Sequence, residues 1–572
     1  MEPVAKTARG LWRSVAQTGA LWGAGAVFLA LVGLVEAVSH LQIVAGVLSL
    51  AYALLLLAGL GAGVQVSRRR PDAPAWQRIV GGALAGALAG VLVGLLVVVG
   101  RSVNLRIMLI NASPPLYEIL SFGRGAGGLP LMVLVQAGAG AIGAAAPLLP
   151  SWFRRPVLAG LETAFVIGLF QDLVQLMLQS GVRASLRSLL FTGDGLALQG
   201  AVGLFALAAG GNILWGRYRA PAGQWASRQP APRRRVLRGI SVVVVLAAIL
   251  VLPWVGGLYL SQVLVLVGLY TLMGLGLNLE VGFAGLLDLG FVAFFAVGAY
   301  TVGLLTTTGP LAVAHLAWWT VVPIATAVSL IAGIFFGLPI LRIRGDYLAI
   351  ATLGFGEIIR LLVLSDFLRP WLGGSQGVLG IPRPMLVGLE FRGPQQLFYL
   401  TVVASALVAF VAARLRDSRL GRAWMAVRED EDVAEALGIN TVNVKLLAYG
   451  IGGAFAGISG AIFAVMLGSV FPHSFSVLIS INVLALIIVG GMGSLPGVMV
   501  GSLALIGLPE LLREFSDFRF LVYGAVLIVM MQFRPEGLWP TAVARRELRE
   551  GEQASTIPAG AVELAGAKEG DG

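Results

Sequence analysis

Long, continuously apolar stretches recur along nearly the whole chain and are separated by short polar loops. A helix needs about 20 apolar residues to cross the ~30 Å hydrocarbon core of a membrane, and several of the stretches reach that length. They do not show the alternating polarity of the short strands in a membrane β-barrel. The pattern therefore predicts an all-α, polytopic integral membrane protein. The clearest stretches occupy residues 41–64, 80–100, 157–178, 239–252, 400–413 and 446–467.

The positions of Lys and Arg predict how these spans cross, because short cytoplasmic loops are enriched in both residues. Basic clusters at residues 6–13, 68–78, 154–155 and 217–238 are placed in the cytoplasm, which puts six helices in residues 1–215. The prediction is about sixteen membrane segments with both termini in the cytoplasm. The ten spans expected in the second region are 240–256, 258–279, 285–306, 320–341, 347–364, 397–413, 446–468, 479–490, 498–508 and 519–533.

The two short stretches at 479–508 are separated by the glycine-rich sequence GGMGSLPG. Non-helical backbone at membrane depth is tolerated only where protein or a water-filled cavity surrounds it. The pair is therefore either a broken or re-entrant feature of a transport pathway, or two helices joined by a tight turn.

The arginine-rich segment between residues 216 and 238 is the best domain boundary in the chain. We expect an N-terminal six-helix membrane region at 1–215, a basic cytoplasmic linker at 216–238 and a second membrane domain at 239–540. The remaining residues, 541–572, are charged at first and then rich in Ala, Gly and Glu, and this composition predicts a disordered cytoplasmic tail.

Composition supports the membrane assignment and excludes several other classes. Of 572 residues, 58% are hydrophobic and only 12% are charged, about half the charged fraction of a soluble domain. The net charge of +11 lies in short loops, as orientation signals do, so nucleic acid is not expected as a partner. Cysteine is absent, which excludes disulfides and Cys-based metal sites. The three histidines lie near predicted span ends, and no metal site is expected.

Residues 414–445 form a charged segment, RLRDSRLGRAWMAVREDEDVAEALGINTVNVK, between two predicted spans. Residues 423–437 are predicted to form one short amphipathic helix, since Trp424, Val427, Ala434 and Leu437 recur at roughly helical spacing. Gly438 stands where a C-terminal cap is expected. Such a segment is either a docking surface or a solvated loop.

The sequence GRAWMAVREDEDVAEALGINTVNVKLLAY strongly resembles the cytoplasmic coupling segment of LivM-type branched-chain amino acid permeases. Three further stretches are similar to signatures of this family and follow in the expected order: GLNLEVGFAGLLDLGFVAFFAVGAY, LRIRGDYLAIATLGFGEIIRLL and ALIIVGGMGSLPGVMVGSLALIGLPELL. The resemblance covers about residues 240–540. Residues 1–215 contain no second coupling segment and match no family that we recognise.

The resemblance implies a permease subunit of an ATP-binding-cassette importer in a bacterial or archaeal inner membrane. The implied partners are separate ATPase subunits, a second permease subunit, which favours a heterodimer, an extracytoplasmic substrate-binding protein and the lipid bilayer. The implied substrates are branched-chain or related amino acids, with urea or amides as alternatives. The residues implied to contact the ATPase are Gly421, Arg422, Ala423, Trp424, Arg428, Glu429, Glu435, Ala436, Leu437 and Gly438.

The chain lacks the phosphate-binding loop of an ATPase, because none of its three lysines follows a glycine as the motif G-x-x-x-x-G-K-[ST] requires. The protein is therefore expected to be no enzyme and to hold no cofactor, with ATP and Mg²⁺ used by partner subunits. An ion- or proton-coupled secondary transporter is the main alternative. A membrane enzyme or scaffold would draw on the unexplained N-terminal helices.

Polar groups at membrane depth are the candidates for a transport pathway, because ionisable residues are rare there and by default functional. Glu357 and Arg360 are spaced to pair on one helix, either as a structural pair or as part of a gate. A polar stripe with Glu162 and Asp172 either packs against neighbouring helices or lines a second pathway. The pathway candidates are Asn278, Asp288, Thr352, Glu357 and Asn482.

Overall fold

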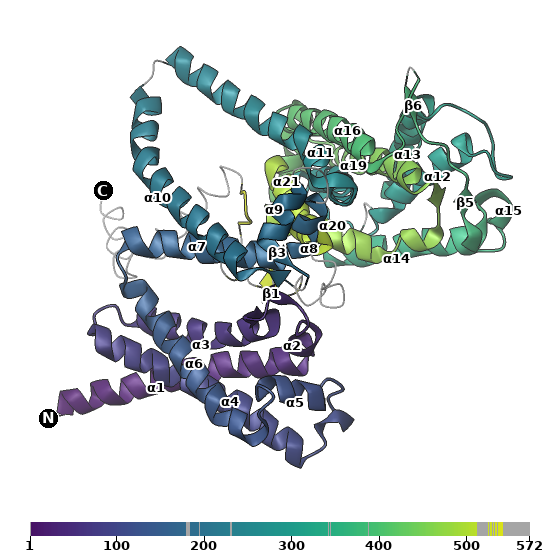
Figure 1. Cartoon of the computed structure of the whole chain (residues 1–572). Helices are drawn as coiled ribbons and strands as arrows, with labels where there is room; N and C mark the ends of the chain where they lie inside the picture. Colours follow the sequence, from purple (N-terminus) through teal and green to yellow (C-terminus); the bar gives the residue numbers. More distant parts are fainter. Residues whose placement is uncertain are drawn as a thin grey trace, which may run out of the picture. The chain divides into compact units, whose positions relative to one another are not determined.

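The computed structural model describes residues 2–178, 183–193, 195–228, 231–340, 343, 345–386 and 388–511, with positions 524, 527, 528, 530, 532, 534 and 536–540. The described chain is helical apart from strands of two or three residues, which confirms the all-α class (Figure 1). It divides into two compact units, residues 1–245 and 246–572. The predicted span 519–533 falls mostly, and the predicted tail 541–572 entirely, outside the described residues.

Among the described residues, eleven helices are long and apolar enough to cross a membrane. Two shorter apolar helices, Val292–Thr306 and Leu495–Leu511, coincide with predicted spans. The spans predicted at 240–256 and 258–279 count as one candidate, Ile249–Phe283, although the backbone leaves helical geometry at Gly257. The span predicted at 157–178 is interrupted after Leu169. Sixteen crossings are thus more than the helix lengths establish.

The first unit is a bundle in which α4 packs along α1, α3 and α6. A small sheet of strand order β2-β1-β4-β3 joins two distant loops, with β1 and β4 parallel. Its helices are α1 (Glu2–Leu31), α2 (Leu34–Ala37), α3 (Leu50–Arg69), α4 (Ala75–Ser102), α5 (Pro114–Leu120), α6 (Gly128–Ala145), α7 (Ser151–Leu169), α8 (Gln171–Met177), α9 (Arg183–Leu190) and α10 (Leu198–Arg228); its strands are β1 (Gln42–Val44), β2 (Leu48–Ser49), β3 (Phe191–Thr192) and β4 (Gly195–Leu196).

The second unit is organised around α19, which packs against α12, α13 and α16 (Figure 1). Its span is 72% buried, the largest fraction of any candidate span. Short antiparallel strand pairs, β5 with β8 and β6 with β7, lie in its loops. The helices are α11 (Ala231–Leu277), α12 (Val292–Thr306), α13 (Trp318–Ile340), α14 (Asp346–Leu364), α15 (Arg369–Leu372), α16 (Pro394–Arg416), α17 (Arg419–Glu429), α18 (Glu431–Ala436), α19 (Thr441–Leu467), α20 (Val477–Gly490), α21 (Leu495–Ser502) and α22 (Leu508–Leu511); the strands are β5 (Val378–Leu379), β6 (Met385–Leu386), β7 (Leu389–Glu390) and β8 (Ser469–Val470).

Two π-helical turns interrupt the second unit, η4 (Asn278–Phe283) at the end of α11 and η7 (Leu503–Gly507) after α21. Such turns are rare and occur frequently at functional sites. The pair predicted at 479–508 consists of α20 and α21, which pack against each other and are joined by residues 491–494. The structure thus places a glycine turn between two helices at this point.

Candidate functional site: the coupling segment and the broken helix

The charged segment between α16 and α19 folds as two helices, α17 and α18, and not as the single helix predicted over 423–437. Asp430 ends α17 with an extended backbone, and its side chain accepts a hydrogen bond from the Val433 N–H (3.0 Å) as the N-cap of α18. Gly438, with φ of +86°, closes α18 as predicted. Asp430, as an N-cap, therefore separates two helices where hydrophobic periodicity predicted one continuous helix.

The inner face of this coupling segment, residues 417–440, is fixed to the membrane bundle. Trp424 is fully buried, and its Nε1 donates a hydrogen bond to the Val444 carbonyl oxygen of α19 (2.7 Å). Lys445 Nζ lies 2.6 Å from Glu431 Oε1, and its side chain is 6% exposed. The tryptophan and the ion pair anchor α17 and α18 respectively, so the two helices are expected to move together with α19.

The outer face presents apolar side chains among charges. Leu437 is 77% exposed, whereas Trp424, Val427 and Ala434 are buried, so Leu437 does not share their face as its helical spacing predicted. Gly421 and Trp424 are buried and Ala423 is half-buried. The remaining implied ATPase contacts are exposed: Arg422, Arg428, Glu429, Glu435, Ala436, Leu437 and Gly438. Met425 and Val433 are exposed as well. Met425, Val433 and Leu437, called the apolar patch below, have charged neighbours in the sequence, and exposed apolar groups of this kind mark interaction sites.

Arg428 connects the coupling segment to the π-helical end of α11. Its Nη1 donates a hydrogen bond to the Gly282 carbonyl oxygen of η4 (2.5 Å), 146 residues away in the chain. Its aliphatic stem packs against Gly285, where an added Cβ would lie 2.8 Å from Arg428 Cγ. The side chain therefore lies partly against the bundle and is not wholly available to a partner subunit.

Asn278 opens η4 and reaches the glycine turn between α20 and α21. It is fully buried, and its Oδ1 accepts a hydrogen bond from the Gly493 N–H (2.8 Å). One side chain thus ties the π-helical turn η4 to the glycine turn between α20 and α21. Together with Arg428, Asn278 links the coupling segment to the break predicted as a pathway feature.

Asp288 and Thr352 organise the loop that leads from η4 into α12. Asp288 is 1% exposed, and its Oδ1 accepts a hydrogen bond from the Gly290 N–H (2.7 Å), a local partner that the sequence did not suggest. The Thr352 hydroxyl of α14 accepts one from the Leu289 N–H (3.0 Å). Both side chains therefore satisfy backbone groups of this loop.

Glu357 and Asn482 lie outside this network. Glu357 forms the predicted pair with Arg360, whose Nε donates to Glu357 Oε2 (2.9 Å), and its side chain is 36% exposed. Asn482 is half-buried on α20. The space between α12, α14 and η6 (Pro472–Ser474) measures about 10 Å³, which is room for about one water molecule. It does not accommodate an amino acid.

Sequence reasoning overlooked Glu280, which lies one residue beyond the span predicted at 258–279, whereas the helix in the structure continues through it as part of the candidate span Ile249–Phe283. Glu280 is fully buried in η4, and its carboxyl group interacts with that of Asp288. An added Cβ at Gly452 of α19 would lie 2.0 Å from Glu280 Oε1. Neither oxygen of Glu280 has a hydrogen-bond donor among the described residues. The rule that flags ionisable residues at membrane depth would have found it.

Replacing Asn278 with Ala is expected to destabilise the second unit, because it leaves the buried Gly493 N–H without its acceptor. Such a loss costs about 1–3 kcal/mol. Asn278→Asp keeps an acceptor oxygen and is expected to recover part of that loss. The measurement is thermal unfolding of the purified protein, with Asn482→Ala as the matched control. Equal shifts for Asn278→Ala and Asn482→Ala would contradict the assigned role.

Comparison with known proteins identifies the second unit. The family described as branched-chain amino acid transport system, permease component, matches residues 259–531. The chain is 41% identical over 310 residues to the high-affinity branched-chain amino acid transport system permease protein LivM of Salmonella typhimurium, covering 50% of this chain and 71% of that protein. LivM of Escherichia coli is 40% identical, and the match covers 50% of this chain and 70% of that protein. The LivH permease of E. coli is 25% identical, and the match covers 47% of this chain and 90% of that protein. No solved structure matches this chain.

Proposed function

The chain belongs to the family of branched-chain amino acid transport system permeases, and from that premise we propose how its second unit works. It is the permease component of an ATP-binding-cassette transport system and is not catalytic. The relationship implies a transporter complex, and permeases of this family typically hold no cofactor. We propose that residues 239–540 form half of a pathway for branched-chain amino acids, and that a second permease subunit forms the other half.

The observation that carries the proposal is the two-faced coupling segment. Trp424 and the Glu431–Lys445 pair attach its inner face to α19, whereas Met425, Val433 and Leu437 project from its outer face. Separate ATPase subunits, which bind ATP and Mg²⁺, dock on that outer face. Glu429, Glu435 and Arg422 surround the apolar contacts and restrict which partner surface fits.

Movement of the docked ATPase is transmitted into the bundle by two routes. One passes through Trp424 and Lys445 to α19, and the other through Arg428 to the Gly282 carbonyl in η4. In the proposal η4 is the point at which α11 bends, since π-helical turns occur frequently at functional sites. From η4 the displacement reaches the glycine turn through Asn278. Asp288 and Thr352 keep the following loop in register, and Glu357 and Asn482 remain pathway candidates.

The membrane arrangement of the proposal follows the basic loops. Placing the coupling segment in the cytoplasm also places both termini there, in a bacterial or archaeal inner membrane. The shorter helices α12 and α21, the interrupted helix α7–α8, a second crossing within α11 and the span predicted at 519–533 are proposed as the additional crossings that bring the total to about sixteen. An extracytoplasmic binding protein delivers the substrate on the opposite side. Residues 1–215 form an added six-helix region, joined through the basic linker 216–238.

Introducing a charge into the exposed apolar patch is expected to prevent assembly with the ATPase. Leu437→Asp alters a side chain that is 77% exposed, so the permease itself should fold normally. The measurement is co-purification of the ATPase subunits with the tagged full-length chain, followed by leucine uptake in cells. If Leu437 is a hot spot of the interface, its loss costs ~2 kcal/mol or more, which corresponds to at least about a thirtyfold loss of affinity.

Met385→Asp is the matched control, because Met385 is also exposed (60%) but lies on β6, outside the coupling segment. It should leave co-purification unchanged. Normal ATPase binding by Leu437→Asp would overturn the docking proposal. Uptake that survives inactivation of the ATPase but ceases when the proton gradient is removed would favour a secondary transporter.

A further inference from the structure

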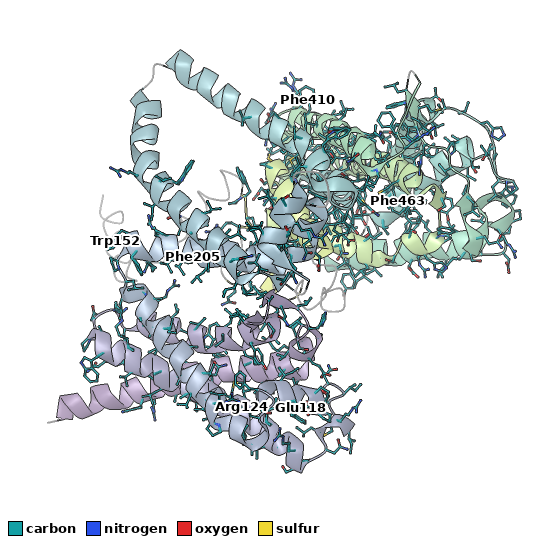
Figure 2. The ribbon with its side chains drawn as sticks, in the orientation of Figure 1. Glu118, Arg124, Trp152, Phe205, Phe410 and Phe463 are labelled. Carbon is teal, nitrogen blue, oxygen red and sulfur yellow. The ribbon has the colours of Figure 1, made fainter. Side chains whose placement is uncertain are left out.

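Helices α7 and α10 of the first unit enclose an open groove that no part of the proposed transport mechanism uses. They are in close contact where Phe205 packs against Gly160, and they diverge from there toward the beginning of α7. Figure 2 labels Trp152, near that beginning, and Phe205. The space between the helices measures about 570 Å³ and is lined by Trp152, Arg155, Val157, Phe205, Asn212 and Ile213, among others. This volume falls in the range of about 300–1,000 Å³ that is typical of small-molecule sites.

Apolar side chains, among them Val157, Phe205 and Ile213, form most of the groove lining, and Asn212 is a neutral polar group among them. Arg155 lies near the beginning of α7, at the end of the groove that we call its entrance. It is exposed and has no acidic partner among the described residues. Its neighbour Arg154 instead donates to the Pro147 carbonyl oxygen (3.4 Å).

The entrance lies at the level of a membrane–water interface. The candidate span of α10 ends at Arg217, one residue beyond Gly216 of the groove lining. Trp152 is 75% exposed at the same end and contacts Phe153 edge to face. Tryptophan is enriched at this level of the bilayer, where its ring meets the headgroups.

We propose that this groove binds an anionic phospholipid of the surrounding membrane. One acyl chain lies between α7 and α10 toward Phe205, and the headgroup phosphate pairs with Arg155. Basic pockets between membrane helices are known to bind anionic lipid headgroups in this way. A zwitterionic amino acid fits less well, because none of the described residues that line the groove is acidic and could pair with its ammonium group.

The test uses the full-length protein in nanodiscs that contain a photoreactive phosphatidylglycerol, with a diazirine on its acyl chain. The crosslinked peptides are identified by mass spectrometry. Labelling is expected on residues 151–157 and 205–216, and unlabelled phosphatidylglycerol should compete with it better than phosphatidylcholine does. Arg155→Gln should reduce labelling about fivefold, the ratio corresponding to ~1 kcal/mol for one arginine near anionic lipid. Ala209→Trp fills the groove and should abolish labelling.

Arg68→Gln is the matched control, since it removes an exposed arginine of the same unit outside the groove. The groove peptides of this variant should be labelled to the same extent as those of the unaltered protein. Equal competition by phosphatidylcholine, or unchanged labelling of Arg155→Gln, would overturn the proposal. Absence of labelling in the unaltered protein would also overturn it and would indicate that protein occupies the groove. Elution profiles in gel filtration verify that each variant is folded.

Discussion

Replacing Arg428 with alanine is expected to uncouple ATP hydrolysis from amino acid uptake while leaving the ATPase bound. The substitution removes the charged hydrogen bond to the Gly282 carbonyl in η4 but leaves Trp424, Lys445 and the exposed Leu437 in place. Hydrogen bonds to charged groups are worth about 1.5–3 kcal/mol. Uptake by the complex in liposomes should therefore fall by about ten- to a hundredfold. Hydrolysis of ATP by the same liposomes should continue.

Arg422→Ala is the control variant, because it also removes one positive charge from helix α17. Arg422 lies on the same helix, but its Nη1 donates to the Asp417 carbonyl oxygen (3.2 Å) at the exposed beginning of the segment. There the hydrogen bond from Arg416 lowers the pKa of the Asp417 carboxyl, so that carboxyl stays charged in neutral solution. Because Arg422 belongs to the proposed docking face, Arg422→Ala is expected to weaken ATPase binding, but uptake per bound ATPase should be retained. If Arg428→Ala instead lost the ATPase altogether, Arg428 would be a docking residue and not a transmitting one.

The importance of Arg428 illustrates what the sequence predicted and where it failed. The motif placed Arg428 in the coupling segment, and hydrophobic periodicity placed Trp424 and Val427 on its inner face. Neither indicates which carbonyl a guanidinium reaches 146 residues away. Similarly, one helix was predicted where Asp430 divides two, because an aspartate that caps a helix fits the same polar positions as one on a helix surface.

The buried faces of the helices were less predictable than the positions of the long apolar helices, and the reason is physical. In a membrane, side chains that face lipid and side chains that face other helices are both apolar. The sequence therefore predicts that a helix spans but not which of its faces is covered. Asn278 was recognised as unusual because it is polar, yet its partner Gly493 lies in a turn that seemed separate. The groove between α7 and α10 could not be inferred, since it arises from the divergence of two helices.

Glycine packing in α19 leads to the second large expected effect. Gly460 lies so close to α12 that an added Cβ would be 2.1 Å from the Phe295 carbonyl oxygen and 2.8 Å from the Ala299 nitrogen. Both neighbours are backbone atoms, which no side-chain rotation can move away. Small residues at such crossings let membrane helices approach closely. Gly460→Ala is therefore expected to destabilise the second unit by about 3 kcal/mol, the upper end of the 1–3 kcal/mol that overpacking a core typically costs.

Gly354→Ala is the matched substitution, because Gly354 is also within a helix, α14, and an added Cβ there has no atom within 4 Å. Alanine is preferred to glycine in a helix by roughly 0.5–1 kcal/mol. The midpoint of thermal unfolding of Gly354→Ala should therefore stay the same or rise, while that of Gly460→Ala falls. Similar midpoints for the two variants would mean that α12 and α19 separate at little cost. In that case α19 would not be the rigid element through which the coupling segment moves the bundle.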